Sequence, residues 1–210
     1  VKAWTRGTPL SEAREIFRGQ KTDVAVQGTV LRDADGKVQA VAVVRAVSFF
    51  ETEYHLITDK GPVKLPFPLR SSIQGLVDGQ LVFTVEQDWP EGGAKEGDLL
   101  AYDLAALKAD PAKARPELIL RPTARQAIEQ VATTRNRLVV ALYEDVKGGV
   151  LSFRHDAGQW SSTRLDLPKD SSLTIAKCSI PVSSRCSIRS KSHPAGSSKP
   201  PASQMVAMVG

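Results

Sequence analysis

The chain has 210 residues, of which 41% are hydrophobic and 24% charged, a composition typical of a globular protein with a sizeable core. Its net charge of +5 comes from the segment after residue 170, which is basic and free of acidic residues, so the remainder is neutral and does not predict a nucleic-acid surface. Both cysteines (Cys178 and Cys186) lie in that segment, which excludes a disulfide framework before it, and no apolar run approaches the roughly 20 residues of a membrane helix.

The first 66 residues predict short strands and turns. Residues 1–5 resemble the end of a strand, and residues 11–15 predict a single helical turn. Because the chain begins with Val inside a strand pattern, we expect its true N-terminus to be missing. The first full unit, residues 24–66, follows as a meander with tight hairpin turns. Its four strands are predicted at residues 24–31, 38–47, 49–57 and 63–65.

Two further units of the same kind follow along the chain. The second, residues 72–121, is interrupted by a glycine-rich excursion at residues 89–97 and includes a short helix at 105–109. The third spans residues 127–167, with turns at 147–149 and 156–158. The strands of the second unit are predicted at residues 72–76, 81–86, 99–104 and 117–120, and those of the third at 127–132, 138–143, 150–154 and 162–167.

A turn followed by a short inner strand that is apolar on both faces recurs in all three units. The copies begin at Val38, Leu81 and Leu138, and a spacing of about 50 residues is typical of propeller blades. A half-exposed strand would carry polar residues on one face, so these strands predict sheets covered on both sides. We therefore predict an all-β fold, an incomplete β-propeller of about three four-stranded antiparallel blades. The alternative, a helix over residues 123–146, is opposed by the turn-like residues 133–136.

The strand pattern ends near residue 176. A fourth unit is expected to start at residues 172–175, but the sequence beyond it shows neither strand nor helix periodicity. Residues 177–210 contain nine serines, four prolines and no acidic residue, a composition that predicts disorder. We therefore divide the chain into a partial propeller at residues 1–176 and a Ser/Pro-rich basic tail at residues 177–210. The tail is either natural or the product of a frameshift.

Five phrases stand in order along the chain: VKAWTRGTPL (residues 1–10), RAVSFFETEYHL (45–56), DGQLV (78–82), QDW (87–89) and VATTRNRL (131–138). Together they resemble the prolyl oligopeptidase family of serine peptidases, in the middle of its N-terminal seven-bladed propeller. The resemblance covers residues 1–176 and includes no catalytic signature. It implies a propeller that caps an α/β-hydrolase domain with a Ser-Asp-His triad. It also implies that the propeller screens substrates, so that short peptides reach the buried site and are cleaved after proline.

The chain offers no complete catalytic constellation of that family. A nucleophile elbow requires Gly-x-Ser-x-Gly, because small flanking residues permit the strained turn, and the nearest segment, residues 196–200, ends in proline. His55 lies in a strand-like run, His155 beside a turn and His193 in the tail. We interpret all three as surface or edge histidines rather than catalytic bases, and we expect the catalytic domain to be absent from this chain.

Other candidate sites are better explained as structure. Residues 92–97 are rich in glycine, but Asp98 stands where a phosphate-binding loop requires lysine, so we predict a hairpin tip. Asp33 and Asp35 lack the further ligands of a calcium loop and are predicted to be turn residues. The two cysteines have no second pair to complete a metal site. The sequence therefore predicts no catalytic, cofactor-binding or metal residue in this chain.

The leading hypothesis is a truncated substrate-gating propeller segment of a prolyl-oligopeptidase-like serine endopeptidase, inactive alone. The alternative is a non-enzymatic, propeller-type interaction module that uses the blade tops and residues 92–97. Trp89 and Trp160 are candidate binding aromatics, but we interpret them as packing at blade edges. We expect a peptide partner only within a full-length parent, no nucleic-acid or membrane partner, self-association through open blade edges, and a cytoplasmic location.

Overall fold

The computed structural model describes residues 1–145, 147–167, 171–176, 186–192 and 205–209. Within this part of the chain the regular structure is almost entirely β: antiparallel strands form one two-stranded, three four-stranded and one three-stranded sheet. The helical elements described are 3-10 turns at Leu10–Glu12 and Pro90–Gly92 and the helix α1 (Leu104–Ala109). No helix in the described residues is long and apolar enough to cross a membrane.

Each four-stranded sheet is a meander in which strands adjacent in sequence pair with one another, which confirms the three predicted blades. The first sheet contains β3 (Ala25–Arg32), β4 (Val38–Ala46), β5 (Thr52–Thr58) and β6 (Gly61–Lys64). The second contains β7 (Ser71–Val77), β8 (Gln80–Val85), β9 (Leu99–Asp103) and β10 (Glu117–Leu120). The third contains β11 (Gln126–Thr133), β12 (Leu138–Glu144), β13 (Lys147–Asp156) and β14 (Gln159–Arg164).

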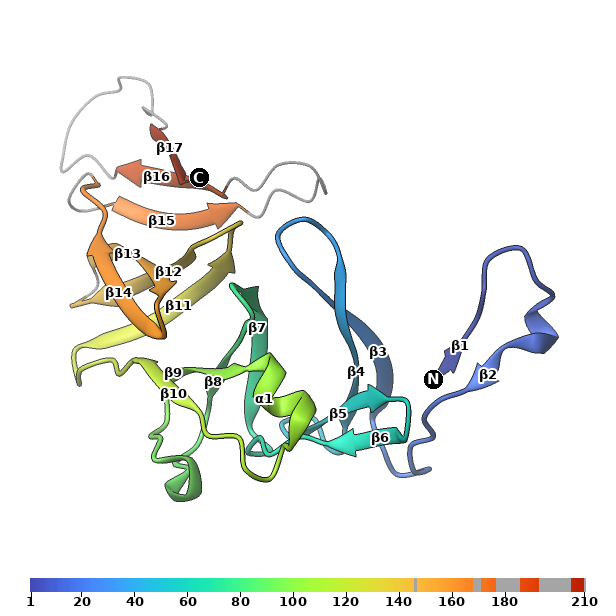
Figure 1. Cartoon of the computed structure of the whole chain (residues 1–210). Coiled ribbons are helices and arrows are strands. Elements are labelled where there is room, and N and C mark those ends of the chain that lie inside the picture. Colours follow the sequence, from blue (N-terminus) through green and yellow to red (C-terminus); the bar gives the residue numbers. More distant parts are fainter. Residues whose placement is uncertain (146, 168–170, 177–185, 193–204, 210) are drawn as a thin grey trace.

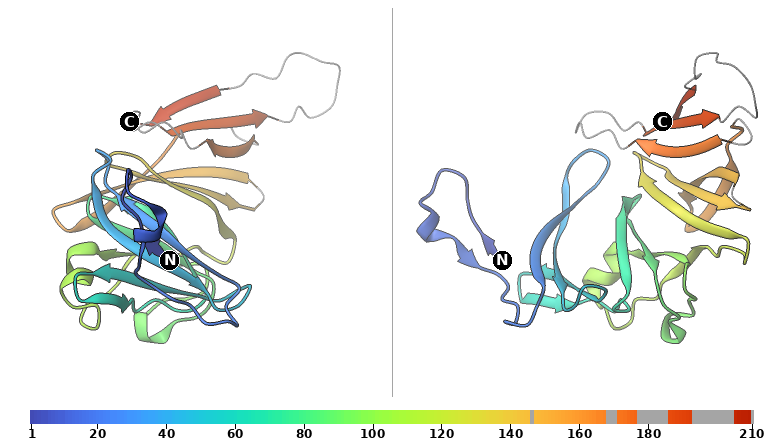
Figure 2. Two further views of the ribbon diagram at one scale, coloured as in Figure 1. Left: turned by 90° about the vertical axis from the view of Figure 1, so that its right-hand side faces the viewer. Right: turned by 180° about the vertical axis from the view of Figure 1, so that it is seen from behind.

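The sheets follow one another around an open arc (Figure 1), and the view from behind shows the same order (Figure 2). One end of the arc carries the short N-terminal strands β1 (Lys2–Ala3) and β2 (Arg14–Glu15). The first strands of neighbouring sheets, β3, β7 and β11, contact one another in turn. This is the arrangement of consecutive propeller blades, and it confirms the predicted fold class of an incomplete propeller.

The second strands of the second and third sheets send alternate side chains to the cores on their two sides. In β8, Leu81 and Phe83 belong to the core shared with the first sheet, whereas Val82 belongs to the core shared with the third. In β12, Leu138 packs toward the second sheet and Val139 toward the segment after residue 170. All five side chains are fully buried. These two strands, both predicted to be apolar on both faces, are therefore sandwiched between sheets, whereas Val38 at the start of the corresponding strand of the first sheet is 46% exposed.

Tight turns join the strands within a sheet. Between β7 and β8, Asp78 and Gly79 have φ angles of 47° and 74°, and between β13 and β14, Ala157 and Gly158 have φ angles of 49° and 78°. Two consecutive positive φ angles define a type I′ turn, whose twist matches that of the flanking strands. The turn chemistry of the sequence thus fixes the register of these hairpins.

One turn lies earlier than the sequence predicts. The expected turn at residues 147–149 is wrong, because β13 already begins at Lys147, which pairs with Glu144. Gly149 is part of the strand, where it pairs with Leu142, and does not form a turn. A Cβ at this position would lie 2.9 Å from the guanidinium of Arg164.

The region considered as an alternative helix, residues 123–146, is a hairpin in its described part. β11 and β12 pair along their whole length, and the amide of Thr134 donates to the carbonyl of Arg137 (2.8 Å) in the turn between them. The helical stripe fails because the apolar residues of this segment serve two neighbouring sheets rather than one helix face.

A fourth sheet stands where the sequence predicts only the start of a unit. β15 (Ser171–Ala176) begins as predicted, and β16 (Cys186–Ser192) and β17 (Met205–Val209) extend it in antiparallel order. The structure departs here from the expected disordered tail; the other residues after 176 lie outside the described ones. The physical reason is that a β ladder is held by backbone hydrogen bonds, which an unpaired strand edge offers to sequences without a clear apolar period.

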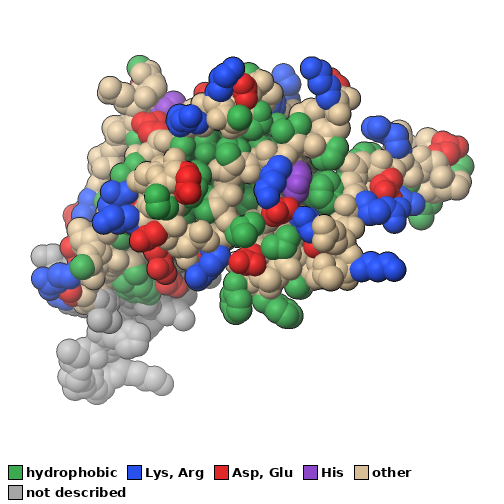
Figure 3. All heavy atoms as spheres, turned by 90° about the horizontal axis from the view of Figure 1, so that it is seen from below, with side chains coloured by type: hydrophobic (Ala, Val, Ile, Leu, Met, Phe, Trp, Pro, Cys, Tyr) green, Lys and Arg blue, Asp and Glu red, His purple; other side chains and the backbone are tan. Residues whose placement is uncertain are grey.

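The surface seen from below carries acidic and basic side chains interspersed with one another, and hydrophobic side chains that project from it (Figure 3). The most exposed large hydrophobic residues are Phe49 and Phe50, at 86% and 79% exposure, in the hairpin tip between β4 and β5. Exposed aromatic pairs of this kind are typical of contact surfaces.

Candidate functional site

The histidines that the structure describes lie against aromatic rings. His55 on β5 packs on Phe17 with ring centroids 4.8 Å apart, and His155 on β13 packs on Trp160 at 5.0 Å. The His55 side chain is 13% exposed, and within the described chain its Nδ1 has no hydrogen-bond partner. Burial lowers the pKa of His55. A packed, neutral imidazole fits a structural role, so our interpretation of these residues as non-catalytic stays a prediction; His193 lies outside the described residues.

Asp33 organises the turn between β3 and β4. Its Oδ1 accepts hydrogen bonds from the amides of Asp35 (3.0 Å) and Lys37 (2.9 Å), and its Oδ2 accepts one from Gln39 (2.6 Å). These contacts satisfy backbone donors as an Asx turn does, in agreement with the predicted turn role. In the described part of the chain, no group of three or more His, Cys, Asp or Glu residues is arranged to hold a metal ion.

The glycine-rich excursion between β8 and β9 is a compact tip. Trp89 and Ala94 exchange backbone hydrogen bonds of 2.9 and 3.0 Å. The Trp89 ring covers Gly92, where a Cβ would lie 2.2 Å from ring atoms, and it packs on Phe83 with centroids 6.4 Å apart. Trp160 packs partly buried against the core between the second and third sheets. Both tryptophans therefore serve packing, as predicted.

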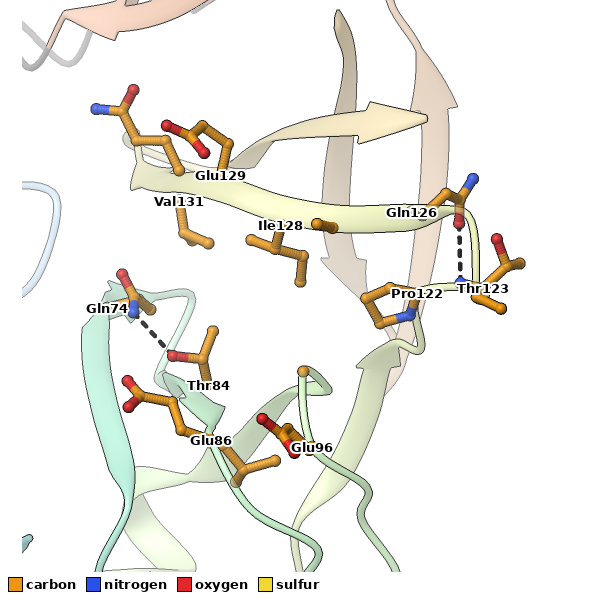
Figure 4. A pocket seen from close by; sticks show the side chains of 15 residues that line it. Gln74, Thr84, Glu86, Glu96, Pro122, Thr123, Gln126, Ile128, Glu129 and Val131 are labelled. Atoms are coloured by element: carbon orange, nitrogen blue, oxygen red, sulfur yellow. Dashed lines mark hydrogen bonds between the residues drawn. The ribbon is translucent and has the colours of Figure 1, made fainter. Parts of the chain in front are cut away.

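A cavity with a volume of about 670 Å³ lies between the second and third sheets. Figure 4 shows its two walls: Gln74, Thr84 and Glu86 on one side, and Ile128 and Val131 on the strand opposite. The remaining lining residues include the loop at Glu96–Gly97 and the segment Pro122–Ala124 that leads into β11. A pocket of this volume is within the range of small-ligand sites.

Both strands that face this pocket are bulged beside it. The pairing of β7 with β8 shifts between Ile73 and Gly75, and that of β11 with β12 shifts between Ile128 and Gln130. Each bulge inserts one extra residue and lets apolar side chains three positions apart reach the same core, as Ile128 and Val131 do. Bulges are frequent next to active and binding sites because they re-aim side chains.

The polar groups that face the pocket are mainly acceptors. Gln74 donates its amide nitrogen to Thr84 Oγ1 (3.0 Å), which leaves its carbonyl oxygen as an acceptor. Glu86 accepts a bond from Ser72 (3.3 Å), and Glu96 is held by a bond from its amide to the carboxylate of Asp88 (3.0 Å). The lining contains no Lys, Arg or His. The pocket is therefore negatively charged.

A buried ion pair fixes one side of the pocket. Asp98 is fully buried, and its carboxylate accepts bonds from Arg121 Nη2 (2.6 Å), Arg121 Nε (3.0 Å) and the amide of Lys95 (2.9 Å). The Arg121 guanidinium also reaches the carbonyl of Gly93 (3.1 Å), and the hydrogen bond to Asp98 raises the pKa of Arg121. This pair ties the excursion after β8 to the chain segment that enters β11.

A second charged cluster lies on the face of the first sheet that turns toward the N-terminal strands. Arg45 donates to Asp23 (2.8 and 2.9 Å) and to Glu53 (2.8 Å). Lys64 pairs with the other oxygen of Glu53 (2.6 Å), and this hydrogen bond lowers the pKa of Glu53. His55 lies beside it, with Nε2 4.0 Å from the Glu53 carboxylate. The charges compensate one another, which fits a role in joining the segment before β3, through Asp23, to the first sheet.

The tips of the first hairpins of the three blades converge on the inner side of the arc (Figure 1). Arg135, in the turn between β11 and β12, pairs with Asp35 of the first sheet at 2.9 Å, across the second sheet. With Asp78 of the second sheet, these tips line a hollow of about 290 Å³. Both partners of the pair are exposed, so its contribution to stability is small.

Sequence reasoning missed the pocket residues Gln74, Glu86 and Glu96 and the buried pair of Asp98 with Arg121. They come from separate strands and loops, and none belongs to a recognisable motif. The available signal was the break in strand alternation, where apolar Ile128 and Val131 stand three residues apart rather than two or four.

Comparison with known proteins places the fold in a family. Residues 1–181 match the family described as the N-terminal β-propeller domain of prolyl oligopeptidase. The chain is 36% identical over 182 residues to the uncharacterized peptidase y4nA of Sinorhizobium fredii, a match that covers 83% of this chain and 25% of that protein. It is 22% identical over 165 residues to the uncharacterized peptidase RP174 of Rickettsia prowazekii, covering 75% of this chain and 23% of that protein.

A solved structure shows the same fold. A post-proline cleaving enzyme from Rickettsia typhi matches with a TM-score of 0.79 and 20% sequence identity, over 90% of this chain and 28% of that one. The chain thus spans about a quarter of the length of the curated relatives it matches.

Proposed function

Because the chain belongs to the prolyl oligopeptidase family, through the N-terminal β-propeller that its residues 1–181 match, we propose that it forms part of a substrate-admitting wall of a serine peptidase. The single observation that carries this proposal is the family match along three consecutive blades that follow one another around an open arc. Sheets of this kind make a rigid curved wall, and such walls select ligands by size and surface rather than by reacting with them.

In this proposal the chain contributes no catalytic group. Acyl transfer to water requires a nucleophile, a base and an orienting acid within hydrogen-bond reach of one another. His55 and His155 instead pack on aromatic rings. We assign the serine chemistry to a hydrolase domain outside this chain, with short proline-containing peptides as the substrates that the wall admits.

A chimera tests this role. The 182 matched residues of the Sinorhizobium relative are replaced by those of this chain. Hydrolysis of a short proline-containing chromogenic peptide is compared with hydrolysis of unfolded casein. We expect the unmodified relative and the chimera to cleave the short peptide and to discriminate against casein to the same extent. We expect the isolated chain to cleave neither.

The controls are the unmodified relative and a chimera whose nucleophilic serine is replaced by alanine. Hydrolysis by the isolated 210-residue chain would contradict the assignment of chemistry to another domain. A folded chimera that cleaves casein as readily as the short peptide would contradict the role in admission.

A non-enzymatic interaction module is the second candidate, and the exposed pair Phe49 and Phe50 favours it. In that case the hairpin tip between β4 and β5 would hold a protein partner. The same chimera separates the two roles, because loss of substrate discrimination in a folded chimera favours the module. For the parent we propose a peptide as partner, neither nucleic acid nor membrane, and a cytoplasmic location.

A further inference from the structure

We infer that the pocket between the second and third sheets binds the cationic group of a peptide, an ammonium or a guanidinium. Taking the ligand to be a peptide rests on the proposed function; the binding of the cationic group is a property of the pocket itself.

Paired bulges shape the two walls of the pocket. β7 and β11 are first strands of neighbouring blades, and each carries a bulge at the pocket. Gln74 lies in the bulge of β7, and Figure 4 shows it on the same wall as Thr84, opposite Ile128 and Val131. A regular strand would direct this side chain differently, since one extra residue reverses the alternation of faces. The bulge of β7 therefore places one acceptor at the cavity, and the bulge of β11 directs the apolar Ile128 and Val131 to its opposite side.

Three hydrogen-bond acceptor groups border the cavity. Gln74 Oε1, the Glu86 carboxylate and the Glu96 carboxylate border the cavity, while the amide nitrogen of Gln74 is committed to Thr84. Ammonium and guanidinium groups are donors without acceptor capacity, so they match a wall of acceptors. Glu129 also belongs to the lining, but its carboxylate points away from the cavity on the far side of β11 (Figure 4).

An apolar wall stands opposite these acceptors (Figure 4). Ile128 and Val131 face the cavity from β11, and Pro122 stands at its edge (Figure 4). Lys and Arg side chains bury their methylene stems along apolar surface while the charged head reaches polar groups. The volume of about 670 Å³ accommodates such a side chain together with the adjoining peptide units.

The carboxylates of Glu86 and Glu96 are not balanced by a cation of the described chain. Among the described residues, neither Glu86 nor Glu96 forms an ion pair, whereas the nearby Arg121 is committed to Asp98. Arg125, beside the entrance, is paired with Asp145. The two carboxylates thus lack a cation from the described chain, and a bound ligand would supply it. The same chemistry is offered by a basic side chain and by a peptide N-terminus, so the test must separate these two sources.

Titration of the full chain, followed by NMR chemical-shift changes and calorimetry, tests this inference. The probes are N-acetyl-lysine amide and N-acetyl-arginine amide for a basic side chain, leucine amide for an N-terminus, and N-acetyl-norleucine amide as the uncharged control. We expect at least one cationic probe to bind about tenfold more tightly than the norleucine probe, with shifts at residues of β7 and β11. Tighter binding of the acetylated lysine or arginine probe identifies a basic side chain as the ligand, and tighter binding of leucine amide identifies a peptide N-terminus.

Matched variants locate the binding. Glu86→Gln with Glu96→Gln is expected to weaken the cationic probe about tenfold, and Glu96→Gln alone about threefold, because each partly exposed carboxylate contributes modestly. Glu91→Gln, in the same excursion but outside the lining, is the control and should leave binding unchanged. Circular dichroism melts verify that the variants fold alike, and the single variant decides if the double variant does not fold.

Equal binding of the norleucine and cationic probes, or unchanged binding in the Glu96→Gln variant, would overturn the inference. Absence of any binding to the folded chain would do the same. These outcomes leave the chimera experiment unaffected, since substrate discrimination by the wall does not require this pocket. Conversely, a chimera without discrimination would leave the probe titrations valid.

Discussion

Replacing Arg121 by alanine tests whether the link between the excursion and β11 depends on a buried charge. Asp98 has a side chain only 1% exposed, whereas that of Arg121 is 42% exposed. Arg121→Ala therefore leaves a buried carboxylate that retains, among the contacts described, only the amide of Lys95. Asp98→Asn leaves a half-exposed guanidinium that water can solvate. The two substitutions break one ion pair but leave different groups behind.

The expected losses of stability differ accordingly. Breaking a fully buried pair by removing one partner costs about 3–5 kcal/mol, because the remaining charge is unpaired in a medium of low polarity. Since Arg121 is partly exposed and water can reach the space it leaves, we expect about 2–3 kcal/mol for Arg121→Ala. For Asp98→Asn we expect about 1–2 kcal/mol, toward the lower end of the roughly 1.5–3 kcal/mol of a hydrogen bond to a charged group, because the Asn oxygen still accepts a hydrogen bond.

Equilibrium urea unfolding followed by tryptophan fluorescence measures these losses. With a slope of about 2 kcal/mol per molar urea, Arg121→Ala should lower the midpoint by about 1 M or more. The control is Arg18→Ala, which removes the exposed pair with Glu15 and should cost less than about 0.5 kcal/mol. If both arginine variants unfold at the same urea concentration, the argument from burial is refuted.

Three further outcomes are expected. Gly75→Ala should destabilise the chain by about 1–3 kcal/mol in urea unfolding. Gly75 has a φ of 153°, and a Cβ there would lie 2.9 Å from the Thr133 hydroxyl. An unchanged urea midpoint would contradict the close approach of β7 and β11. The free energy of unfolding should decrease as the pH falls below about 6.5, the ordinary pKa of histidine. The pKa of His55 is lowered in the folded chain, so the unfolded chain binds the proton at a higher pH. His55→Gln should flatten this decrease between about pH 7 and 5.5, and an unaltered slope would exclude His55 as its source. Sedimentation velocity should show concentration-dependent self-association through the open face of the first sheet, where Val24 and Val30 are 48% and 45% exposed, and serine at both positions should weaken it; a monomer at all concentrations would contradict the open-face expectation.

The blades could be predicted from the sequence because the signal is local. Residues 138–143 are apolar at every second position on both faces, and the structure buries Leu138 toward one sheet and Val139 toward the other. The turn at Asp78-Gly79 was equally readable, since both residues tolerate positive φ. Local composition misled at residues 147–149, where the glycines stand in a strand rather than in a turn. Gly148 and Gly149 pair with Tyr143 and Leu142 of β12.

The fourth sheet could not be predicted, because its evidence is tertiary. The side chain of Gln130 donates to the carbonyl of Ile175 (2.8 Å) and accepts from its amide (2.9 Å), which fastens β15 to the third sheet. Neither residue announces this contact in the sequence. A pattern that depends on apolar periodicity cannot detect strands that are held by backbone pairing and by a distant amide side chain.

The pocket escaped prediction for a related reason, and this reason bears on its function. Its polar residues stand at positions that the packing of the blades does not dictate: a bulge, a strand end and a loop. Ile128 and Val131 must fill the core between two sheets, whereas Glu86 and Glu96 are exposed and leave the fold intact if they change. A propeller can therefore keep its wall while the chemistry of the gaps between its blades varies. The two carboxylates are in this sense a choice of the sequence rather than a requirement of the fold, and substitution of them should alter binding while stability stays nearly constant.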